Sequence, residues 1–225
     1  MRKLANPEKA KILAGFFKTG KGEYGEGDIF LGIQVPDTRK VAKSYLHLDD
    51  NAIRELLESK IHEHRLAALL ILVEKYRKSD EKQKKKIADF YLANTDRINN
   101  WDLVDLSADK ILGEYLYDKN DKEKSILYEL AKSSNLWERR IAMISTFAFI
   151  KKGKFEDTFK IAEILFGDKH DLIHKAVGWM LRELGKRNQE AEEKFLKKHY
   201  KKMPRTALRY AIERFDEKKK IFYMS

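Results

Sequence analysis

The chain has 225 residues, of which 43% are hydrophobic and 37% are charged, and its formal net charge is +11. This surplus of Lys and Arg favours an anionic partner, and nucleic acid is the commonest such partner. The sequence contains no cysteine, which excludes disulfides, thiolate zinc sites, iron–sulfur clusters and a cysteine nucleophile.

Two features bear on secretion and membranes. The first ten residues, MRKLANPEKA, lack the apolar segment of a secretory signal. The longest apolar run, LAALLILV from Leu66 to Val73, is too short to cross a bilayer. We therefore expect a cytoplasmic protein that has no membrane association.

Apolar residues recur every three or four positions along most of the chain, and this spacing predicts helices. Only GEYGEGDIFLGIQVP lacks a helical period over a long stretch, and no alternating strand pattern is present. We predict an all-α fold with helices near residues 7–18, 38–47, 50–59, 62–78, 80–93, 101–117, 121–133, 136–151, 155–166, 171–187, 189–200 and 205–215.

The predicted helices repeat in pairs. A polar or charged residue two positions before a small one recurs at 65, 105, 140, 174 and 205, in steps of 40, 35, 34 and 31 residues. This period is near that of HEAT- or armadillo-like repeats, in which stacked helix pairs curve and their second helices line a concave face. We predict a right-handed HEAT-like α-solenoid, with an irregular helical bundle as the alternative. The row along its concave face would be Arg65, Asp105, Arg140, His174 and Arg205.

All three tryptophans, Trp101, Trp137 and Trp179, lie on predicted inner helices. Each alone is more typical of a core, but three beside a charged row favour a nucleic-acid surface, where cations hold phosphates and rings meet bases or sugars. Residues 186–220 add 13 basic against 6 acidic residues. The pattern predicts a concave basic groove that binds DNA.

The remaining candidate sites are weaker. His62 and His64, or His170 and His174, have spacings found in metal sites, yet no third ligand is in register, so we interpret them as structural or capping residues. The glycines of GEYGEG lack the Gly-Lys-Ser/Thr ending of a phosphate-binding loop. We predict no metal site and no cofactor.

The segment NNWDLVD places Trp101 and Asp105 four residues apart, which puts both on one face of a helix. A ring face beside a carboxylate is suited to recognising a cation. The plain alternative is that Trp101 belongs to the core and Asp105 is solvated.

Four segments, FLGIQVPDTRKVAK, NNWDLVD, NLWERRIA and HKAVGWMLRELGK, resemble the signature segments of the AlkD-like DNA glycosylases, the DNA alkylation repair family. The resemblance covers roughly residues 30–215. It implies a HEAT-like solenoid that excises N3-methyladenine and N7-methylguanine from duplex DNA, working along the backbone with little or no base pocket. Some relatives lack catalytic residues and glycosylase activity.

Matching segment to segment, the resemblance implies that Asp105 is the catalytic carboxylate and that Trp101 and Trp179 contact the sugar and backbone. It also implies that Arg140 binds a phosphate. Many members carry a second aromatic residue before the first tryptophan, where this chain has Asn100.

We therefore predict a DNA-alkylpurine glycosylase formed by residues 1–225 as one domain, acting as a monomer on double-stranded DNA that contains alkylated bases. Its cationic substrates leave without prior protonation, and Asp105 would stabilise the oxocarbenium-like sugar and orient water. The alternative is a non-catalytic HEAT-repeat module that binds DNA or a protein. The predicted DNA-binding residues are Arg140, Arg65, Arg139, Lys175, Arg182 and Arg205.

Overall fold

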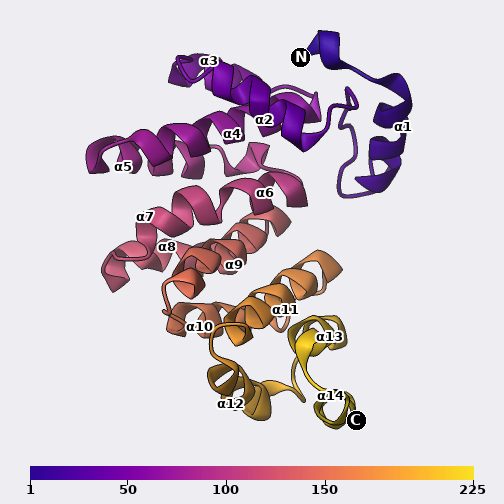
Figure 1. Ribbon diagram of the computed structural model, residues 1–225, viewed down its shortest axis with the longest axis vertical. Helices are drawn as coiled ribbons and strands as arrows, with labels where there is room; N and C mark the ends of the chain where they lie inside the picture. The colour runs from indigo at the N-terminus through magenta and orange to yellow at the C-terminus, as the bar shows by residue number, and fades with distance from the viewer. The chain divides into compact units, whose positions relative to one another are not determined.

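The computed structural model describes residues 1–225, and its regular structure is helical (Figure 1). An isolated parallel bridge between Ile29 and Ile61 is the only strand-like pairing. The chain divides into two compact units, Met1–Ser107 and Ala108–Ser225. The prediction of an all-α fold is confirmed. None of the helices is both long and apolar enough to cross a membrane.

The first unit contains six α-helices. They are α1 (Pro7–Phe16), α2 (Val35–Ser44), α3 (Asp50–Leu57), α4 (His62–Lys78), α5 (Glu81–Leu92) and α6 (Trp101–Ser107), with 3₁₀ turns η1 (Arg2–Leu4) and η2 (Thr95–Arg97). The second unit opens with a π-helical turn, η3 (Asp109–Gly113), and its helices follow in chain order. They are α7 (Glu114–Leu116), α8 (Asp121–Ala131), α9 (Leu136–Lys151), α10 (Glu156–Leu165), α11 (Asp171–Gly185), α12 (Gln189–His199), α13 (Arg205–Ala211) and α14 (Glu217–Met224), with the 3₁₀ turn η4 (Ile212–Arg214) before α14.

Short polar side chains fix where most helices begin. In each case a side-chain atom of the N-cap residue accepts a hydrogen bond from a backbone N–H of the first turn, which would otherwise have no partner. Pro7 follows one of these caps at the first helical position, where its missing N–H costs nothing. The capping residues are Asn6, Asp49, Asp80, Asn120, Asn135, His170, Asn188 and Asp216.

Helix α4 forms the core of the first unit, because α2, α3, α5 and α6 all pack against it. Its segment Leu66–Val73 is buried on every side. This explains why the apolar run is continuous instead of alternating with polar residues, since a helix surrounded by neighbours needs no polar face.

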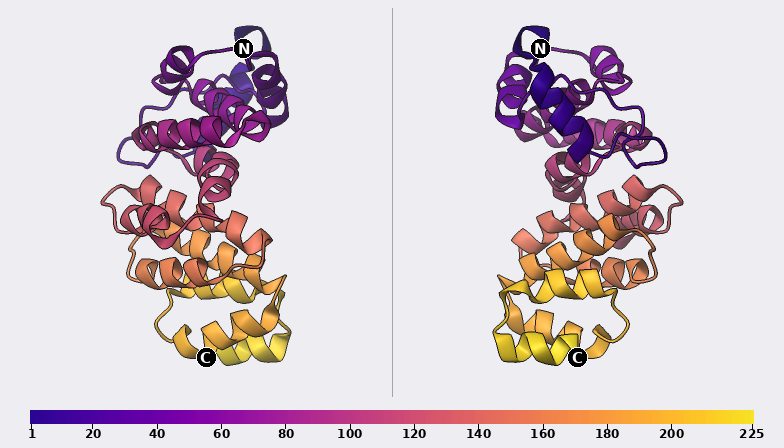
Figure 2. Two further views of the ribbon diagram at one scale, coloured as in Figure 1. Left: turned by 90° about the vertical axis from the view of Figure 1, so that its left-hand side faces the viewer. Right: turned by 90° about the vertical axis from the view of Figure 1, so that its right-hand side faces the viewer.

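The second unit is built from stacked helix pairs. Helix α8 pairs with α9 and α10 pairs with α11, while α9, α11 and α13 pack against one another in succession. Figure 2 shows these ribbons stacked one pair upon the next, from salmon through orange to yellow. This order fits the HEAT-like arrangement predicted from the repeat period.

Two glycines allow the inner helices of the second unit to approach closely. A Cβ added to Gly178 of α11 would overlap the carbonyl oxygen of Ala207 in α13, and one added to Gly113 would overlap the carbonyl oxygen of Ser145 in α9. Glycine is therefore required at both positions by packing, although neither has a positive φ.

Three helix predictions differ from the structure, the first being that the helix predicted near 38–47 lies at Val35–Ser44. The single helix predicted over 101–117 is divided into α6, the π-helical turn and α7, and α14 was not predicted at all. Helix α14 exposes Ile221 and Phe222, so its sequence lacks the buried apolar stripe by which the other helices were recognised.

Candidate functional site

Helix α6 carries the predicted Trp101 and Asp105 in its seven residues, Trp101–Ser107. Both side chains are half-buried, and they lie one helical turn apart, as the spacing predicts. The fully buried Asn100 precedes them, and its Oδ1 accepts a hydrogen bond from the backbone N–H of Trp101 (2.8 Å). Asn100 therefore provides a hydrogen-bond partner for the first backbone N–H of α6.

Trp101 belongs to a cluster of aromatic rings. Its indole stacks on Phe17 with ring centroids 5.0 Å apart and planes at 15°. Phe17 in turn stacks on Phe30 at 5.1 Å, and Phe30 stacks on the imidazole of His62 at 4.5 Å. Phe16, which is 61% exposed, meets Trp101 edge to face at 5.8 Å. One face of the Trp101 indole is therefore covered by the Phe17 ring, and this contact fixes the orientation of the indole.

A buried ionic network lies beside the aromatic cluster. His62 Nε2 is 2.8 Å from Asp102 Oδ2, and His62 Nδ1 is 3.2 Å from Asp28 Oδ2. Arg65 Nη2 donates to the same oxygen of Asp28 (2.6 Å). All four side chains are less than one-tenth exposed. The network ties α4 to the loop before α2 and to the first turn of α6.

The pKa values in this network follow from its hydrogen bonds. Burial alone would lower the pKa of His62, but the bonds to Asp102 and Asp28 outweigh it and raise that pKa. For Asp28, burial would raise the pKa, but His62 and Arg65 outweigh it and lower the value. The bonds to the two acids therefore favour the protonated form of His62, and the guanidinium of Arg65 favours the charged form of Asp28.

The sequence-based reasoning did not assign Asp28, His62 or Asp102 to the site. Their bonds span 34 and 40 residues of sequence, so no local spacing reveals them. The one available signal was Asp102 itself, a carboxylate among apolar residues next to Trp101. A buried acid in such a position requires a partner.

The other predicted catalytic residue and the predicted phosphate ligand lie in the second unit. Trp179 is half-buried on α11, with its ring 6.2 Å from that of Phe147. Arg140 on α9 is only 5% exposed and donates a hydrogen bond to the carbonyl oxygen of Leu172. Trp137 is buried and belongs to the core.

The remaining predicted DNA-binding residues also make bonds within the protein. Arg65 is 4% exposed and ion-paired with Asp28, so contact with a phosphate would compete with that pair. Arg205 is exposed. DNA contact by these residues stays a prediction. Their internal partners are Asp168 for Arg139, Asp171 for Lys175, Glu213 for Arg182 and the carbonyl of Met224 for Arg205.

The turns before α4, α9 and α11 share one hydrogen bond, which we call the turn anchor. A side chain near the start of the helix donates to the carbonyl oxygen of the residue six positions earlier. The pairs are Arg65–Ser59 at 2.8 Å, Arg139–Ser133 at 2.9 Å and His174–Asp168 at 2.6 Å. The sequence alignment that placed Arg140 in register with Arg65 and His174 was therefore wrong by one residue, because Arg139 makes the equivalent bond.

The candidate histidines have structural roles. His62 bridges two carboxylates, His174 makes a turn anchor, and His170 Nδ1 accepts from the N–H of Leu172 to cap α11. His64 Nδ1 lies 3.0 Å from the hydroxyl of Ser59. Each of these four histidines therefore has a hydrogen-bond partner within the protein.

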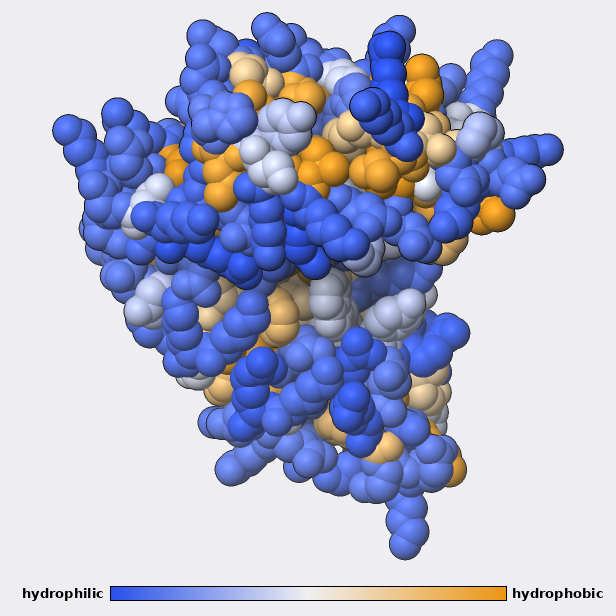
Figure 3. Space-filling view, turned by 45° about the horizontal axis from the view of Figure 1, so that its top comes forward, coloured by the Kyte–Doolittle hydropathy of each residue, from blue (hydrophilic) through white to orange (hydrophobic).

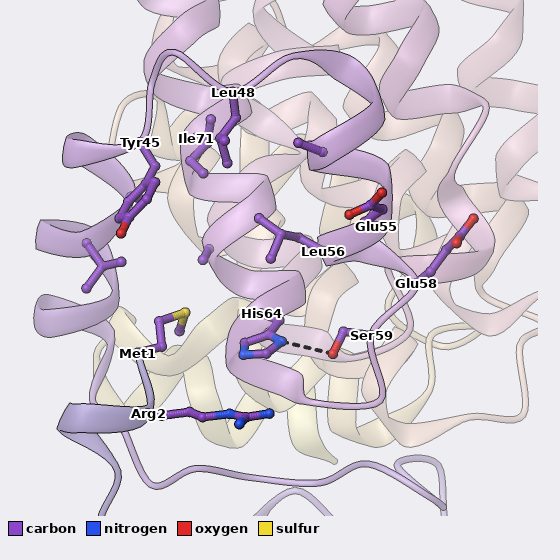
Figure 4. A pocket seen from close by; sticks show the side chains of 14 residues that line it. Met1, Arg2, Tyr45, Leu48, Glu55, Leu56, Glu58, Ser59, His64 and Ile71 are labelled. Atoms are coloured by element: carbon purple, nitrogen blue, oxygen red, sulfur yellow. Dashed lines mark hydrogen bonds between the residues drawn. The ribbon is translucent and has the colours of Figure 1, made fainter.

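A separate cavity of about 720 Å³ lies among α2, α3 and α4. Figure 4 shows Tyr45, Leu48, Leu56 and Ile71 around it, with Glu55 and Glu58 on α3 and the following turn. Figure 3 shows hydrophobic side chains among hydrophilic ones on the face that the N-terminal helices present. None of the predicted site residues lines this cavity, so we do not assign the predicted chemistry to it.

The fold is similar to several solved structures. A predicted DNA alkylation repair enzyme from Enterococcus faecalis matches with a TM-score of 0.73 at 18% identity, covering 95% of this chain and 97% of that chain. AlkD2 from Streptococcus mutans matches with a TM-score of 0.58 at 19% identity, covering 96% of this chain and 100% of that one. The protein smu.31 from Streptococcus mutans UA159 has a TM-score of 0.57 and 21% identity, over 81% and 93% of the two chains.

No curated protein sequence matches the chain. A sequence profile of the DNA alkylation repair enzymes, however, matches residues 1–215, nearly the whole length. The chain therefore belongs to the DNA alkylation repair enzyme family.

Proposed function

We propose that the protein is a DNA glycosylase that hydrolyses the N-glycosidic bond of N3-methyladenine and N7-methylguanine in duplex DNA. The observation that carries this proposal is the pairing of Trp101 and Asp105 on α6, half-buried, in a chain of the DNA alkylation repair family. A carboxylate beside a ring face is suited to a sugar that becomes cationic during the reaction.

The reaction needs no protonation of the leaving group. An N3- or N7-alkylated purine already carries a positive charge, and when the bond to C1′ breaks, its electron pair passes to the base and neutralises it. The sugar becomes oxocarbenium-like, and water adds to C1′ and loses a proton. Asp105 would stabilise the sugar cation electrostatically and orient the water.

The buried network supplies positioning for this chemistry. His62 holds Asp102 at the first turn of α6, and Asp102 stands between Trp101 and Asp105 in the sequence. The stack of Trp101 on Phe17 holds the indole in one orientation. A carboxylate stabilises a developing charge best when its surroundings are fixed before the reaction.

In the second unit, we assign Trp179 to the sugar and backbone and Arg140 to a phosphate. The net charge of +11 supports an anionic substrate. Because Arg140 is 5% exposed, it would act as a fixed donor near the surface and not as a mobile side chain.

The direct test is to incubate the purified protein with methylated duplex DNA and to measure the bases released. We expect free N7-methylguanine and N3-methyladenine, together with abasic sites in the DNA. Binding to duplex DNA without base release would instead favour the non-catalytic DNA-binding module, and loss of both properties would favour a protein-binding one.

A further inference from the structure

Trp179 is the residue of the second unit that we assign to the sugar, and the ring of Phe147 lies beside it. The two residues belong to the packed helices α11 and α9, and their ring centroids are 6.2 Å apart with planes at 45°. This separation is within the roughly 4.5–7 Å found for interacting aromatic pairs. Phe147 is the only aromatic ring that contacts Trp179, so it is the ring that can restrict how the indole turns.

Two cations hold the ring of Phe147. Lys151 Nζ lies 4.2 Å from the ring centroid, one helical turn further along α9, and Arg187 Cζ lies 5.6 Å from it. A cation within about 6 Å of a ring centroid is attracted by the electrons of the ring face. Phe147 is only half-buried, and these contacts restrict a side chain that packing alone would leave freer to turn.

Each of the two cations is in turn fixed by a bond within the second unit. Lys151 Nζ donates to Asp109 Oδ2 (2.7 Å), and Asp109, in the π-helical turn, is only 3% exposed. Arg187 Nη1 donates to the carbonyl oxygen of Glu183 (2.8 Å). A continuous series of contacts therefore leads from the buried acid of the π-helical turn to the ring of Phe147.

We propose that Phe147 is a positioning residue for the excision reaction, because it holds the indole of Trp179 in the orientation in which the ring face meets the deoxyribose. A cation is attracted to the face of a ring and not to its edge, so an indole that turns freely spends less time in the productive orientation. Phe17 has the equivalent place beside Trp101 in the first unit. Lys151 acts one step further back, by fixing Phe147. This inference rests on the proposed glycosylase function.

The first test compares single-turnover excision of N7-methylguanine with DNA binding. Phe147→Leu removes the ring but keeps an apolar side chain, and it should slow excision about three- to tenfold while the affinity for duplex DNA stays within about twofold. Phe147→Tyr keeps the ring, so its excision rate should stay within about twofold of wild type. The control is Phe159→Leu, which removes a half-buried ring stacked on Phe195 and should leave excision unchanged.

A double-mutant cycle separates positioning from a general loss of stability. If Phe147 acts through Trp179, Phe147→Leu should slow excision by less than about a further twofold in a protein that already carries Trp179→Ala. Rate effects that multiply in the double variant would overturn the inference. Wild-type excision by a folded Phe147→Leu protein would also overturn it, and the proposed function would remain.

The orientation of the indole can also be measured without DNA. In protein labelled with a fluorinated tryptophan, the fluorine resonance of Trp179 is identified by its loss in Trp179→Phe. Lys151→Met leaves the ring of Phe147 in place but removes the cation that holds it, so this resonance should move toward that of the free amino acid. Asp109 keeps Lys110 as a partner in this variant, so the variant should remain folded.

The outcomes of this measurement separate the inference from the proposed function. A Trp179 resonance that Lys151→Met leaves unmoved, or that Phe159→Leu moves equally, overturns the inference even if the enzyme excises methylated purines. A resonance that responds to Lys151→Met alone, in a protein that releases no base from methylated DNA, retains Phe147 as the residue that holds the indole and removes the glycosylase.

Discussion

Asp105 is the residue on which the proposed chemistry depends. Replacing it by Asn keeps the shape of the side chain but removes its charge. We expect excision of N7-methylguanine to fall at least tenfold, about 1.4 kcal/mol of barrier, while DNA binding persists because a negative charge near the phosphates has gone. Single-turnover excision and filter binding on the same preparations measure the two effects.

Two tryptophan variants provide the comparison. Trp101→Ala and Trp179→Ala should each slow excision less than Asp105→Asn, since a ring face is a weaker electrostatic partner than a carboxylate. Trp101→Ala should also lower the melting temperature, because it removes the ring that stacks on Phe17. Wild-type excision by a folded Asp105→Asn protein would end the assignment of Asp105 as the catalytic carboxylate.

Glu192 makes the stability of the protein depend on pH. Burial raises the pKa of Glu192 from 4.5 to about 8, and the charge of Glu193 adds to the effect. Between these values the unfolded chain loses this proton while the folded chain keeps it, so the free energy of unfolding falls as pH rises. Glu192→Gln should therefore stabilise the protein at neutral pH, on the order of 2 kcal/mol.

The measurement is urea unfolding across pH 5 to 8 for wild type and variant. The increase in the free energy of unfolding caused by Glu192→Gln should grow with pH over that range. Glu190→Gln, at an exposed position of the same helix, should change stability little. If Glu192→Gln raised the free energy of unfolding by the same amount at every pH, the pKa of Glu192 would not be raised by burial.

At the scale of single residues, the pairing of Trp101 and Asp105 on one helical face could be predicted from the sequence, but the contacts that hold α6 in place could not. The spacing of Trp101 and Asp105 is local and follows from helical geometry. The His62 network joins positions 34 and 40 residues apart, and only the packing of α4 against the loop and α6 brings them together.

Among the helices, Gly178 sets how closely α11 approaches α13. An alanine there would overlap the carbonyl oxygen of Ala207, so the helices must separate or bend. We expect Gly178→Ala to lower the free energy of unfolding by about 1–3 kcal/mol, measured by urea unfolding. Gly15→Ala in α1 is the control, because no atom lies within 4 Å of the added Cβ.

The control substitution, Gly15→Ala, should raise the free energy of unfolding and not lower it. At Gly15 the only effect is helix propensity, which favours alanine by up to about 1 kcal/mol. Equal effects of the two substitutions would mean that close approach of α11 and α13 is not required for folding.

The helices themselves were largely predictable, because the residues that form an apolar stripe and a polar cap lie close together in the sequence. The predicted range 62–78 coincides with α4, and 136–151 coincides with α9. The π-helical turn could not be predicted, since the apolar spacing over 101–117 is that of one continuous helix and the close approach of Gly113 to Ser145 of α9 joins positions far apart in the sequence. Helix α14 has the cap, Asp216, but no buried stripe to accompany it.

For the whole molecule, the excess positive charge predicts how DNA binding responds to salt. The logarithm of the affinity for duplex DNA should fall with the logarithm of the salt concentration, with a slope near −0.9 for each phosphate contacted. Arg140→Ala should weaken binding and flatten that slope by about one unit. Fluorescence anisotropy at several salt concentrations measures both.

The control for this experiment is Lys82→Ala at an exposed position of α5, which changes the net charge by the same amount. It should leave the slope nearly unchanged. Binding that does not respond to salt would contradict an electrostatic interaction with the backbone and favour a protein partner.

The net charge could be counted from the composition, but the ion pairs that individual cations form could not be predicted from it. Arg65, Arg139 and Arg182 all look available in the sequence, yet each forms an ion pair with an acid 29 to 37 residues away. Charge that is paired within the fold contributes less to the field that attracts DNA. The net charge therefore predicts an anionic partner but does not predict which cations contact it.

The turn anchor has a consequence for how such a chain can evolve. Each anchor joins a side chain to a carbonyl only six residues away, so a duplicated helix pair would carry this bond with it. Arg65 and Arg139 make this bond before α4 and α9 and His174 makes it before α11, so either a guanidinium or an imidazole can supply the donor. An exchange of Arg for His at such a position is therefore compatible with the same turn, as long as the side chain still reaches the carbonyl oxygen.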